Sequence, residues 1–113
     1  MIKLYGIKNC DSVRKAVKFL VSHDIPYEFV DFRETPVDLQ TIERWLRYTD
    51  IKKLFNTRSA TYRTLDLKKV DLDDEAKKVW LCKENMLIKR PVAELDGGIV
   101  IGYNEDIYRE KLL

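Results

Sequence analysis

The spacing of hydrophobic and polar positions predicts a strand, a helix and a second strand at the start of the chain. Residues 2–7 form a short apolar run typical of a strand, and it is broken by Gly, Asn and Asp. From residue 12 the apolar side chains recur at helical spacing, at Val13, Ala16, Val17, Leu20 and Val21. Asp11 or Ser12 is expected to cap this helix. Residues 27–32 alternate again and predict a strand parallel to the first, because one helix makes the crossover between them.

Helical spacing dominates the middle of the chain. Residues 38–48 and 73–85 are predicted to be helices, with a short helical turn at 51–55. The polar segment 56–67 between them is expected to be irregular. The buried side of the later helix is expected to consist of Ala76, Val79 and Trp80.

Two short strands and a helix follow this middle region. Residues 92–95 and 99–103 have strand character and are separated by Asp-Gly-Gly, a strong hairpin signal. Asn104 is expected to cap a helix that runs to the C-terminus. The order β-α-β, helices over about 36–88, then β-β-α predicts an α/β fold of the thioredoxin type with an inserted helical subdomain. We expect a single domain over residues 1–113.

Composition and charge narrow the classes of function. The 21 basic and 19 acidic residues are interspersed, so charge gives no reason to expect direct binding of nucleic acid. The N-terminus lacks the apolar core of a signal peptide, and no apolar run approaches the roughly 20 residues of a membrane span. We therefore expect a cytoplasmic protein.

The two cysteines, Cys10 and Cys82, lie 72 positions apart, which is neither a disulfide framework nor a metal-ligand spacing. Cys10 lies between a strand and a helix, where unpaired N–H groups and the helix dipole favour a thiolate, and Lys8 adds positive charge. Alternatively, Cys10 is only a small buried side chain. Cys82 lies within a helix and is expected to be structural, with the alternative that it resolves a disulfide on Cys10. His23, the single histidine, is expected to be a charge at a helix end and not a base.

Four motifs, LYGIKNC, NTRS, IKRP and IGYNED, occur in this order between residues 4 and 106. With them the chain resembles the arsenate reductase (ArsC) superfamily, in particular its Spx and YffB branches. The resemblance implies a thioredoxin-like fold with Cys10 as the redox residue and with Arg58 and Arg90 in an anion pocket. It also implies a cis proline at Pro91 beside the sulfur. We expect Ser12 and Lys8 to contribute to binding of the substrate or anion as well.

Each of these residues also has an ordinary structural interpretation. The arginines could be solvated surface charges, Pro91 could be a trans proline at a strand edge, and Ser12 could cap the helix instead of bonding the sulfur. The chain also departs from the family pattern. Val13 stands where Spx regulators have a second cysteine, and Gly102 stands where glutaredoxin-linked arsenate reductases have a third arginine.

The resemblance implies a glutathione-dependent thiol reductase of the single-cysteine YffB type, with glutathione as cosubstrate and no tightly bound cofactor or metal. Cys10 would attack an oxidised sulfur or an oxyanion. The absence of an arginine at Gly102 weakens the case for arsenate as that oxyanion. The alternative is a Spx-like transcriptional regulator that binds the RNA polymerase alpha subunit and catalyses nothing.

Overall fold

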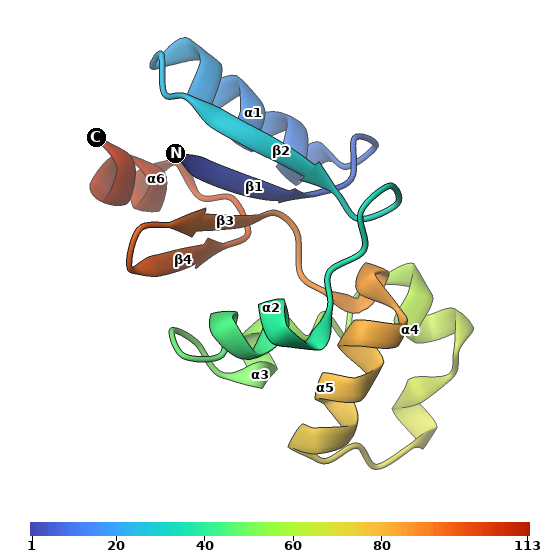
Figure 1. Cartoon of the computed structure of the whole chain (residues 1–113). Coiled ribbons are helices and arrows are strands. Elements are labelled where there is room, and N and C mark those ends of the chain that lie inside the picture. The colour runs from blue at the N-terminus through green and yellow to red at the C-terminus, as the bar shows by residue number, and fades with distance from the viewer. The chain divides into compact units, whose positions relative to one another are not determined.

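The computed structural model describes residues 1–113, which form two compact units (Figure 1). The sheet unit consists of Met1–Thr35 and Arg90–Leu113, and the helical unit consists of Pro36–Lys89. The expectation of a single domain over the whole chain stays a prediction. None of the helices combines the length and the apolar character needed to cross a membrane.

The sheet unit holds four strands in the order β2-β1-β3-β4. The strands are β1 (Ile2–Gly6), β2 (Tyr27–Asp31), β3 (Val92–Leu95) and β4 (Gly98–Ile101). β1 is parallel to β2 and antiparallel to β3, and β3 forms an antiparallel hairpin with β4. At the hairpin turn Gly97 has a φ of +79°, which glycine adopts without steric cost. The predicted β-α-β order and hairpin are therefore confirmed.

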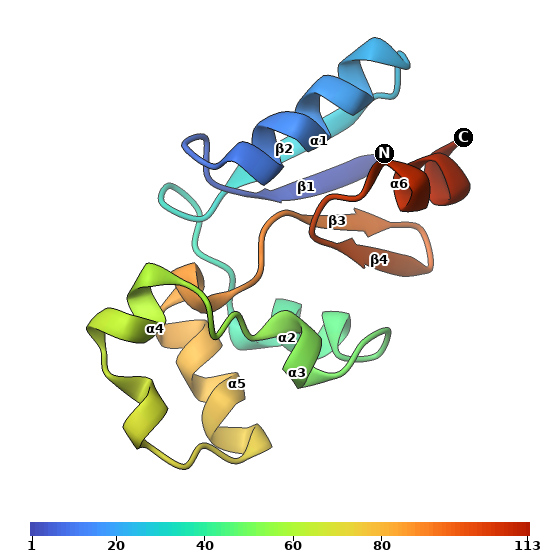
Figure 2. The same cartoon turned by 180° about the vertical axis from the view of Figure 1, so that it is seen from behind.

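One row of apolar side chains runs across all four strands and forms the core of the sheet unit. The pairing register aligns Phe29, Leu4, Ala93 and Val100 in this row. Two helices, α1 (Asp11–Ser22) and α6 (Glu105–Leu112), cover the row (Figures 1 and 2) with the buried side chains Ala16, Phe19, Leu20 and Tyr108.

The inner face of α1 differs from the prediction at one position. Val21 was expected to be buried but is 60% exposed, and Phe19 is buried in its place. The Phe19 ring lies 5.5 Å from the ring of Tyr108 on α6, in an edge-to-face arrangement. The contact with Tyr108 on α6 therefore buries Phe19. The spacing of apolar residues within α1 does not indicate this contact.

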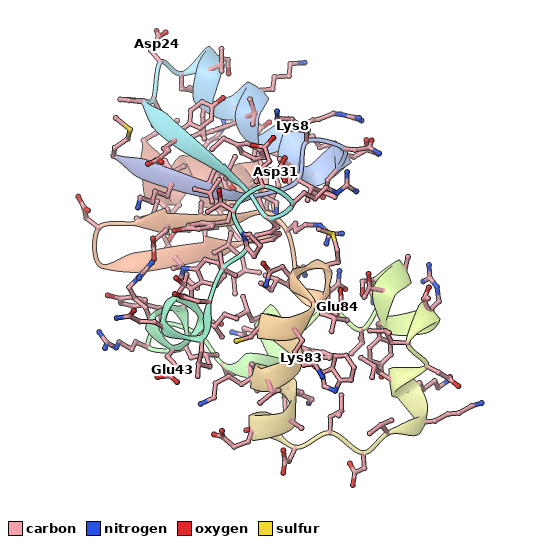
Figure 3. The ribbon with its side chains drawn as sticks, turned by 45° about the vertical axis from the view of Figure 1, so that its right-hand side comes forward. Lys8, Asp24, Asp31, Glu43, Lys83 and Glu84 are labelled. Atoms are coloured by element: carbon pink, nitrogen blue, oxygen red, sulfur yellow. The ribbon has the colours of Figure 1, made fainter.

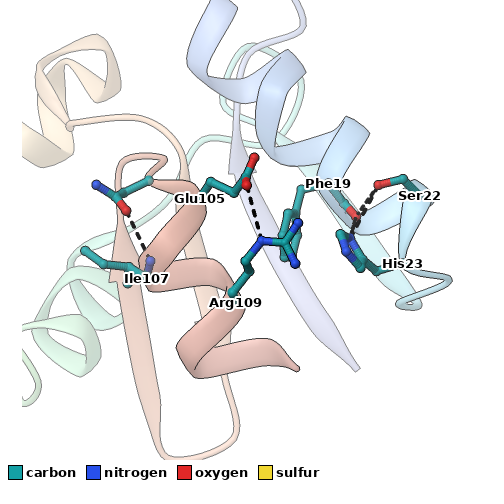
Figure 4. Close-up of polar contacts among 7 residues, drawn as sticks. Phe19, Ser22, His23, Glu105, Ile107 and Arg109 are labelled. Carbon is teal, nitrogen blue, oxygen red and sulfur yellow. Dashed lines mark hydrogen bonds and ion pairs between the residues drawn. The ribbon is translucent and has the colours of Figure 1, made fainter.

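Polar side chains close the ends of both helices (Figure 4). The Oδ1 atom of Asn104 accepts a hydrogen bond from the N–H of Ile107 at 3.1 Å, which confirms the predicted cap of α6. At the other helix, His23 is the C-cap of α1, and its Nδ1 lies 2.9 Å from the carbonyl oxygen of Phe19. His23 therefore has the structural position at a helix end that the sequence predicted.

The helical unit contains four short α-helices and two turns of 3₁₀ helix. They are α2 (Leu39–Trp45), α3 (Ile51–Leu54), α4 (Ala60–Thr64), η1 (Leu67–Lys69), α5 (Asp74–Lys83) and η2 (Asn85–Leu87). The expectation that residues 56–67 are irregular is wrong, because this segment contains α4. The Ser59 Oγ accepts a hydrogen bond from the N–H of Tyr62 at 3.1 Å and caps that helix.

The buried side of α5 also differs from the prediction. Leu81 is fully buried, whereas Val79 is 53% exposed. The face is fixed by Asn85, whose Nδ2 donates to the carbonyl oxygen of Leu81 at 2.8 Å, and whose Oδ1 accepts from the N–H of Val37 at 2.8 Å. The hydrogen bond between Asn85 and Val37 joins residues 48 positions apart, so the local spacing of apolar residues could not indicate it.

Candidate active site

Cys10 is the N-cap residue of α1, so the helix begins one residue earlier than expected, and neither Asp11 nor Ser12 is its cap. Its backbone is extended, with φ −146° and ψ 124°, and its carbonyl oxygen accepts the first helical hydrogen bond from Arg14 at 3.0 Å. The N–H groups of the first turn have no acceptor within the helix. Cys10 is partly exposed, and its side chain makes no hydrogen bond to these donors.

Gly6 lets the start of α1 pack tightly against the end of β1. A Cβ atom at this position would lie 2.6 Å from Cγ2 of Val13, closer than real contacts allow. Val13 itself is buried, at 2% exposure. The position that holds the second cysteine of a Cys-x-x-Cys motif is therefore used here for packing α1 on the sheet.

The pairing register places Pro91 at the same end of the sheet as Cys10. Tyr5 pairs with Val92, so the next residues outward, Gly6 and Pro91, lie opposite each other. The Arg90-Pro91 peptide bond is cis, as the sequence resemblance implied. The carbonyl oxygen of Pro91 accepts a hydrogen bond from the N–H of Gly102 at 2.8 Å, which ties the start of β3 to the end of β4.

The predicted anion-binding residues of the sheet unit are Arg90, Lys8 and Ser12. Arg90 precedes the cis proline and is partly buried, with its Nε shielded from solvent. Lys8 is exposed, and its Nζ lies 4.0 Å from Oε1 of Glu34. An exposed pair at this distance contributes little, so the Lys8 ammonium keeps its hydration. Ser12 lies in the first turn of α1 and is partly buried.

Arg58 belongs to the helical unit and is exposed. Its N–H donates to Oδ1 of Asn56 at 3.0 Å, and its carbonyl oxygen accepts from Nη1 of Arg63 at 3.2 Å. The backbone of the NTRS motif is thus held in a turn, and the guanidinium of Arg58 is left to solvent. A role for Arg58 beside Cys10 stays a prediction.

Cys82 lies on α5 of the helical unit. Burial raises the pKa of its thiol, and the negative charges of Asp38 and Glu43, the latter labelled in Figure 3, raise it further. Cys82 therefore stays a thiol at neutral pH, in agreement with a structural role. No group of three or more histidine, cysteine, aspartate or glutamate side chains has the arrangement of a metal site.

Arg14 is a residue at the site that the sequence reasoning missed. Its Nη1 donates to Oδ1 of Asp11 and its Nη2 to Oδ1 of Asn9, both at 3.0 Å. The three-residue spacing of Asp11 and Arg14 is the usual signal for an ion pair on a helix and was available in the sequence. The hydrogen bond to Asn9 depends on the path of the loop before the helix, so the sequence did not indicate it.

A family model described as the ArsC family matches residues 5–111, nearly the whole chain. The chain belongs to the ArsC family. A protein named "Global transcriptional regulator Spx" from Listeria innocua is 34% identical over 117 residues, which cover 99% of this chain and 87% of that protein. The relatives of this chain therefore include a protein that is named as a transcriptional regulator.

Solved structures of ArsC-family relatives confirm the fold. A protein named YFFB has 32% sequence identity and a TM-score of 0.93, and the match covers 100% of both chains. A protein described as a possible arsenate reductase from Streptococcus mutans has 33% identity and a TM-score of 0.79, and the match covers 95% of this chain and 97% of that one. The predicted thioredoxin-like α/β fold with an inserted helical subdomain is therefore confirmed.

Proposed function

We propose that this ArsC-family chain is a glutathione-dependent thiol reductase that uses Cys10 as its one nucleophile. The observation that carries the proposal is the position of Cys10 as a partly exposed N-cap of α1. The unpaired N–H groups at the start of a helix are a position that generally suits an anion, and the thiolate is the form of a cysteine that attacks disulfides. Cys10, Arg90, Lys8 and Ser12 are the residues of the sheet unit to which the proposal gives a role.

The proposed reaction is a pair of thiol-disulfide exchanges. The Cys10 thiolate attacks the glutathione sulfur of a mixed disulfide, so a bond from Cys10 to glutathione forms and the substrate leaves as a thiolate that takes up a proton. A second glutathione, as thiolate, then attacks the glutathione sulfur bound to Cys10. Oxidised glutathione leaves, and the Cys10 thiolate is regenerated. Overall, one glutathione thiol and the mixed disulfide become the substrate thiol and oxidised glutathione.

The second exchange is assigned to an external thiol because Cys10 is the one cysteine of the sheet unit. Val13, three residues on, is a buried apolar side chain, and Cys82 belongs to the helical unit with a raised thiol pKa. Glutathione carries two carboxylates, and arginine and lysine side chains bind carboxylates well. Arg90 and Lys8 are the proposed partners of these carboxylates.

Gly102 favours a disulfide over arsenate as the substrate. Its φ is +75°, a region that favours glycine, and its N–H bonds the carbonyl oxygen of Pro91. An arginine at this position would occupy a strained conformation. The local backbone at the end of β4 is therefore suited to glycine and not to the third arginine that would bind an oxyanion.

An assay that measures the production of oxidised glutathione from a glutathione mixed disulfide tests the proposal. We expect Cys10→Ser to reduce turnover to the uncatalysed rate, because serine cannot form the mixed disulfide. Cys82→Ser is the matched control and is expected to retain full turnover. Retention of activity by Cys10→Ser, with both variants folded by circular dichroism, would exclude this mechanism. Replacing the disulfide by arsenate tests the oxyanion alternative in the same assay.

A Spx-like regulator that binds RNA polymerase is the second candidate function. The observation that favours it is the 34% identity to a protein named as a global transcriptional regulator, over 99% of this chain. A pull-down with the C-terminal domain of the polymerase alpha subunit tests it. Specific binding that Cys10→Ser leaves unchanged, together with no turnover by the parent protein, would favour the regulator over the reductase.

A further inference from the structure

Arg14 contacts the residues on both sides of Cys10 and Cys10 itself. Its guanidinium donates to Oδ1 of Asp11 and to Oδ1 of Asn9, each at 3.0 Å, and its backbone N–H donates to the carbonyl oxygen of Cys10 at 3.0 Å. A guanidinium is planar and presents its N–H groups in a fixed fork, so it can bond two acceptors at once. The bond to Asn9 therefore fixes the orientation in which the guanidinium meets Asp11.

Asp11 brings an unfavourable charge to the site. It is the residue directly after Cys10, and its side chain is 89% exposed. A carboxylate in the first turn suits the helix dipole, but next to a thiolate it acts as a like charge and disfavours ionisation of the sulfur. The ion pair with Arg14 places a positive charge on this carboxylate. The pair as a whole is close to neutral as seen from Cys10.

Other charged residues also lie at this end of the sheet unit, among them Lys8 and Asp31, which Figure 3 labels. The Nζ of Lys8 lies 4.0 Å from Oε1 of Glu34, and both side chains are exposed, so this ion pair is weak. The Oδ1 of Asp31 accepts a hydrogen bond from the N–H of Arg33 at 2.9 Å. Arg90 precedes the cis proline and adds a positive charge. Asp11 has the carboxylate nearest to Cys10 in the sequence, and Arg14 is the charged group in direct contact with it.

We propose that Arg14 is a positioning residue that sets the reactivity of Cys10 by neutralising Asp11. The inference deepens the proposed function, since it rests on Cys10 being the nucleophile. Arg14 touches no reacting atom in this scheme. It acts through Asp11, and Asn9 keeps it in place.

The test measures the rate of Cys10 alkylation by iodoacetamide as a function of pH, in a Cys82→Ala background. Iodoacetamide is uncharged, so a change of nearby charge does not alter its approach. The variants are Arg14→Met, Asp11→Asn and the two combined. Lys15→Met is the matched control, because Lys15 is the exposed neighbour of Arg14 on α1 and its loss changes the net charge equally.

We expect Arg14→Met to move the midpoint of the alkylation profile upward by about 0.3–0.7 pH units and to slow alkylation at pH 7 about two- to fivefold, the size of one exposed charge interaction. Adding Asp11→Asn should restore both quantities, because the uncompensated carboxylate is then gone. Lys15→Met should leave the profile close to that of the parent. A profile for Arg14→Met equal to that of Lys15→Met, or no recovery in the double variant, would overturn the proposal.

The alkylation profiles and the turnover assay separate this inference from the proposed function. If the parent protein fails to reduce glutathione mixed disulfides but Arg14→Met still shifts the profile as described, the reductase is wrong and the role of Arg14 stands. If the parent turns over and the Arg14→Met profile is unshifted, the role of Arg14 is wrong and the reductase stands.

Discussion

Tyr108 places a polar hydroxyl group in the hydrophobic core of the sheet unit. It is fully buried between the rings of Phe19, at 5.5 Å, and Tyr103, at 4.9 Å. Its hydroxyl is buried and has no hydrogen-bond partner. Burial raises the pKa of Tyr108, and the neighbouring Tyr103 raises it further. The ring stabilises the core of the sheet unit, while the hydroxyl carries a desolvation cost.

Removing this hydroxyl should stabilise the protein. We expect Tyr108→Phe to raise the free energy of unfolding by about 0.5–1 kcal/mol, because it keeps the ring contacts and removes an unsatisfied polar group. Urea unfolding followed by circular dichroism measures this. Tyr103→Phe is the control, since Tyr103 is only partly buried and should change little. A loss of more than about 1 kcal/mol in Tyr108→Phe would mean that the hydroxyl is bonded in solution.

At the scale of elements, short polar side chains define where most helices begin. Five helices have an N-cap whose side chain accepts a hydrogen bond from a backbone N–H of the first turn: α2, α3, α4, α5 and α6, capped by Asp38, Asp50, Ser59, Asp73 and Asn104. The exception with chemical significance is α1, where Cys10 stands at the N-cap and makes no such bond. The first turn of α1 is thereby left open to an anion or a thiolate.

The cap of α2 makes stability depend on pH in the acid range. The N–H and hydroxyl of Thr41 both donate to Oδ1 of Asp38, at 3.0 and 2.9 Å. The backbone N–H and then the hydroxyl lower the pKa of Asp38 below its ordinary value of 3.8. A carboxyl with a lowered folded pKa contributes stability that is fully present above its unfolded pKa and is lost as pH falls through the folded pKa.

Asp38→Asn should remove this pH dependence while keeping the cap, because asparagine caps helices about as well as aspartate. We expect the wild type to be more stable than Asp38→Asn near neutral pH and the difference to disappear as the pH falls below 3.8. Urea unfolding of both proteins across this range measures the difference. A difference that stays constant from neutral to acid pH would show that the Asp38 carboxylate is not stabilised by its cap.

At the scale of the whole molecule, the last residues of the helical unit contact both its first residues and its middle. Asn85 bonds Val37, and the N–H of Lys89 donates to the carbonyl oxygen of Leu54 at 2.8 Å. Phe55 and Ile88 form an isolated antiparallel bridge in the same place. The contact between Asn85 and Val37 brings the end of this segment back to its beginning, and the other two contacts join its end to its middle.

Asn85→Ala should weaken the helical unit strongly for a single substitution. It leaves the buried N–H of Val37 and the carbonyl oxygen of Leu81 unsatisfied, at a cost of about 2–4 kcal/mol for the two groups. Thermal and urea unfolding measure the loss. Asn104→Ala is the matched control, because it removes an exposed cap and should cost about 1 kcal/mol. Equal losses in the two variants would contradict a closing role for Asn85.

Much of the fold could be predicted from the sequence because its signals are local. The hairpin follows from Asp-Gly-Gly, the start of α6 from Asn104, and the β-α-β order from the change between alternating and helical spacing. The placement of Cys10 between a strand and a helix was also readable, and so was the cis bond at Pro91 through the resemblance to the ArsC family.

Contacts between distant segments could be found only in the tertiary structure. Phe19 is buried because α6 brings Tyr108 to it, and Leu81 because Asn85 fixes the face of α5. The bond from Arg14 to Asn9 depends likewise on how the loop before α1 folds back. The sequence by itself determined the order of strands and helices in the sheet unit and where the thiol lies, because caps, turns and apolar spacing act within a few residues. Tertiary structure decided which face of each helix is buried and which charges surround the sulfur, because those depend on packing across the chain.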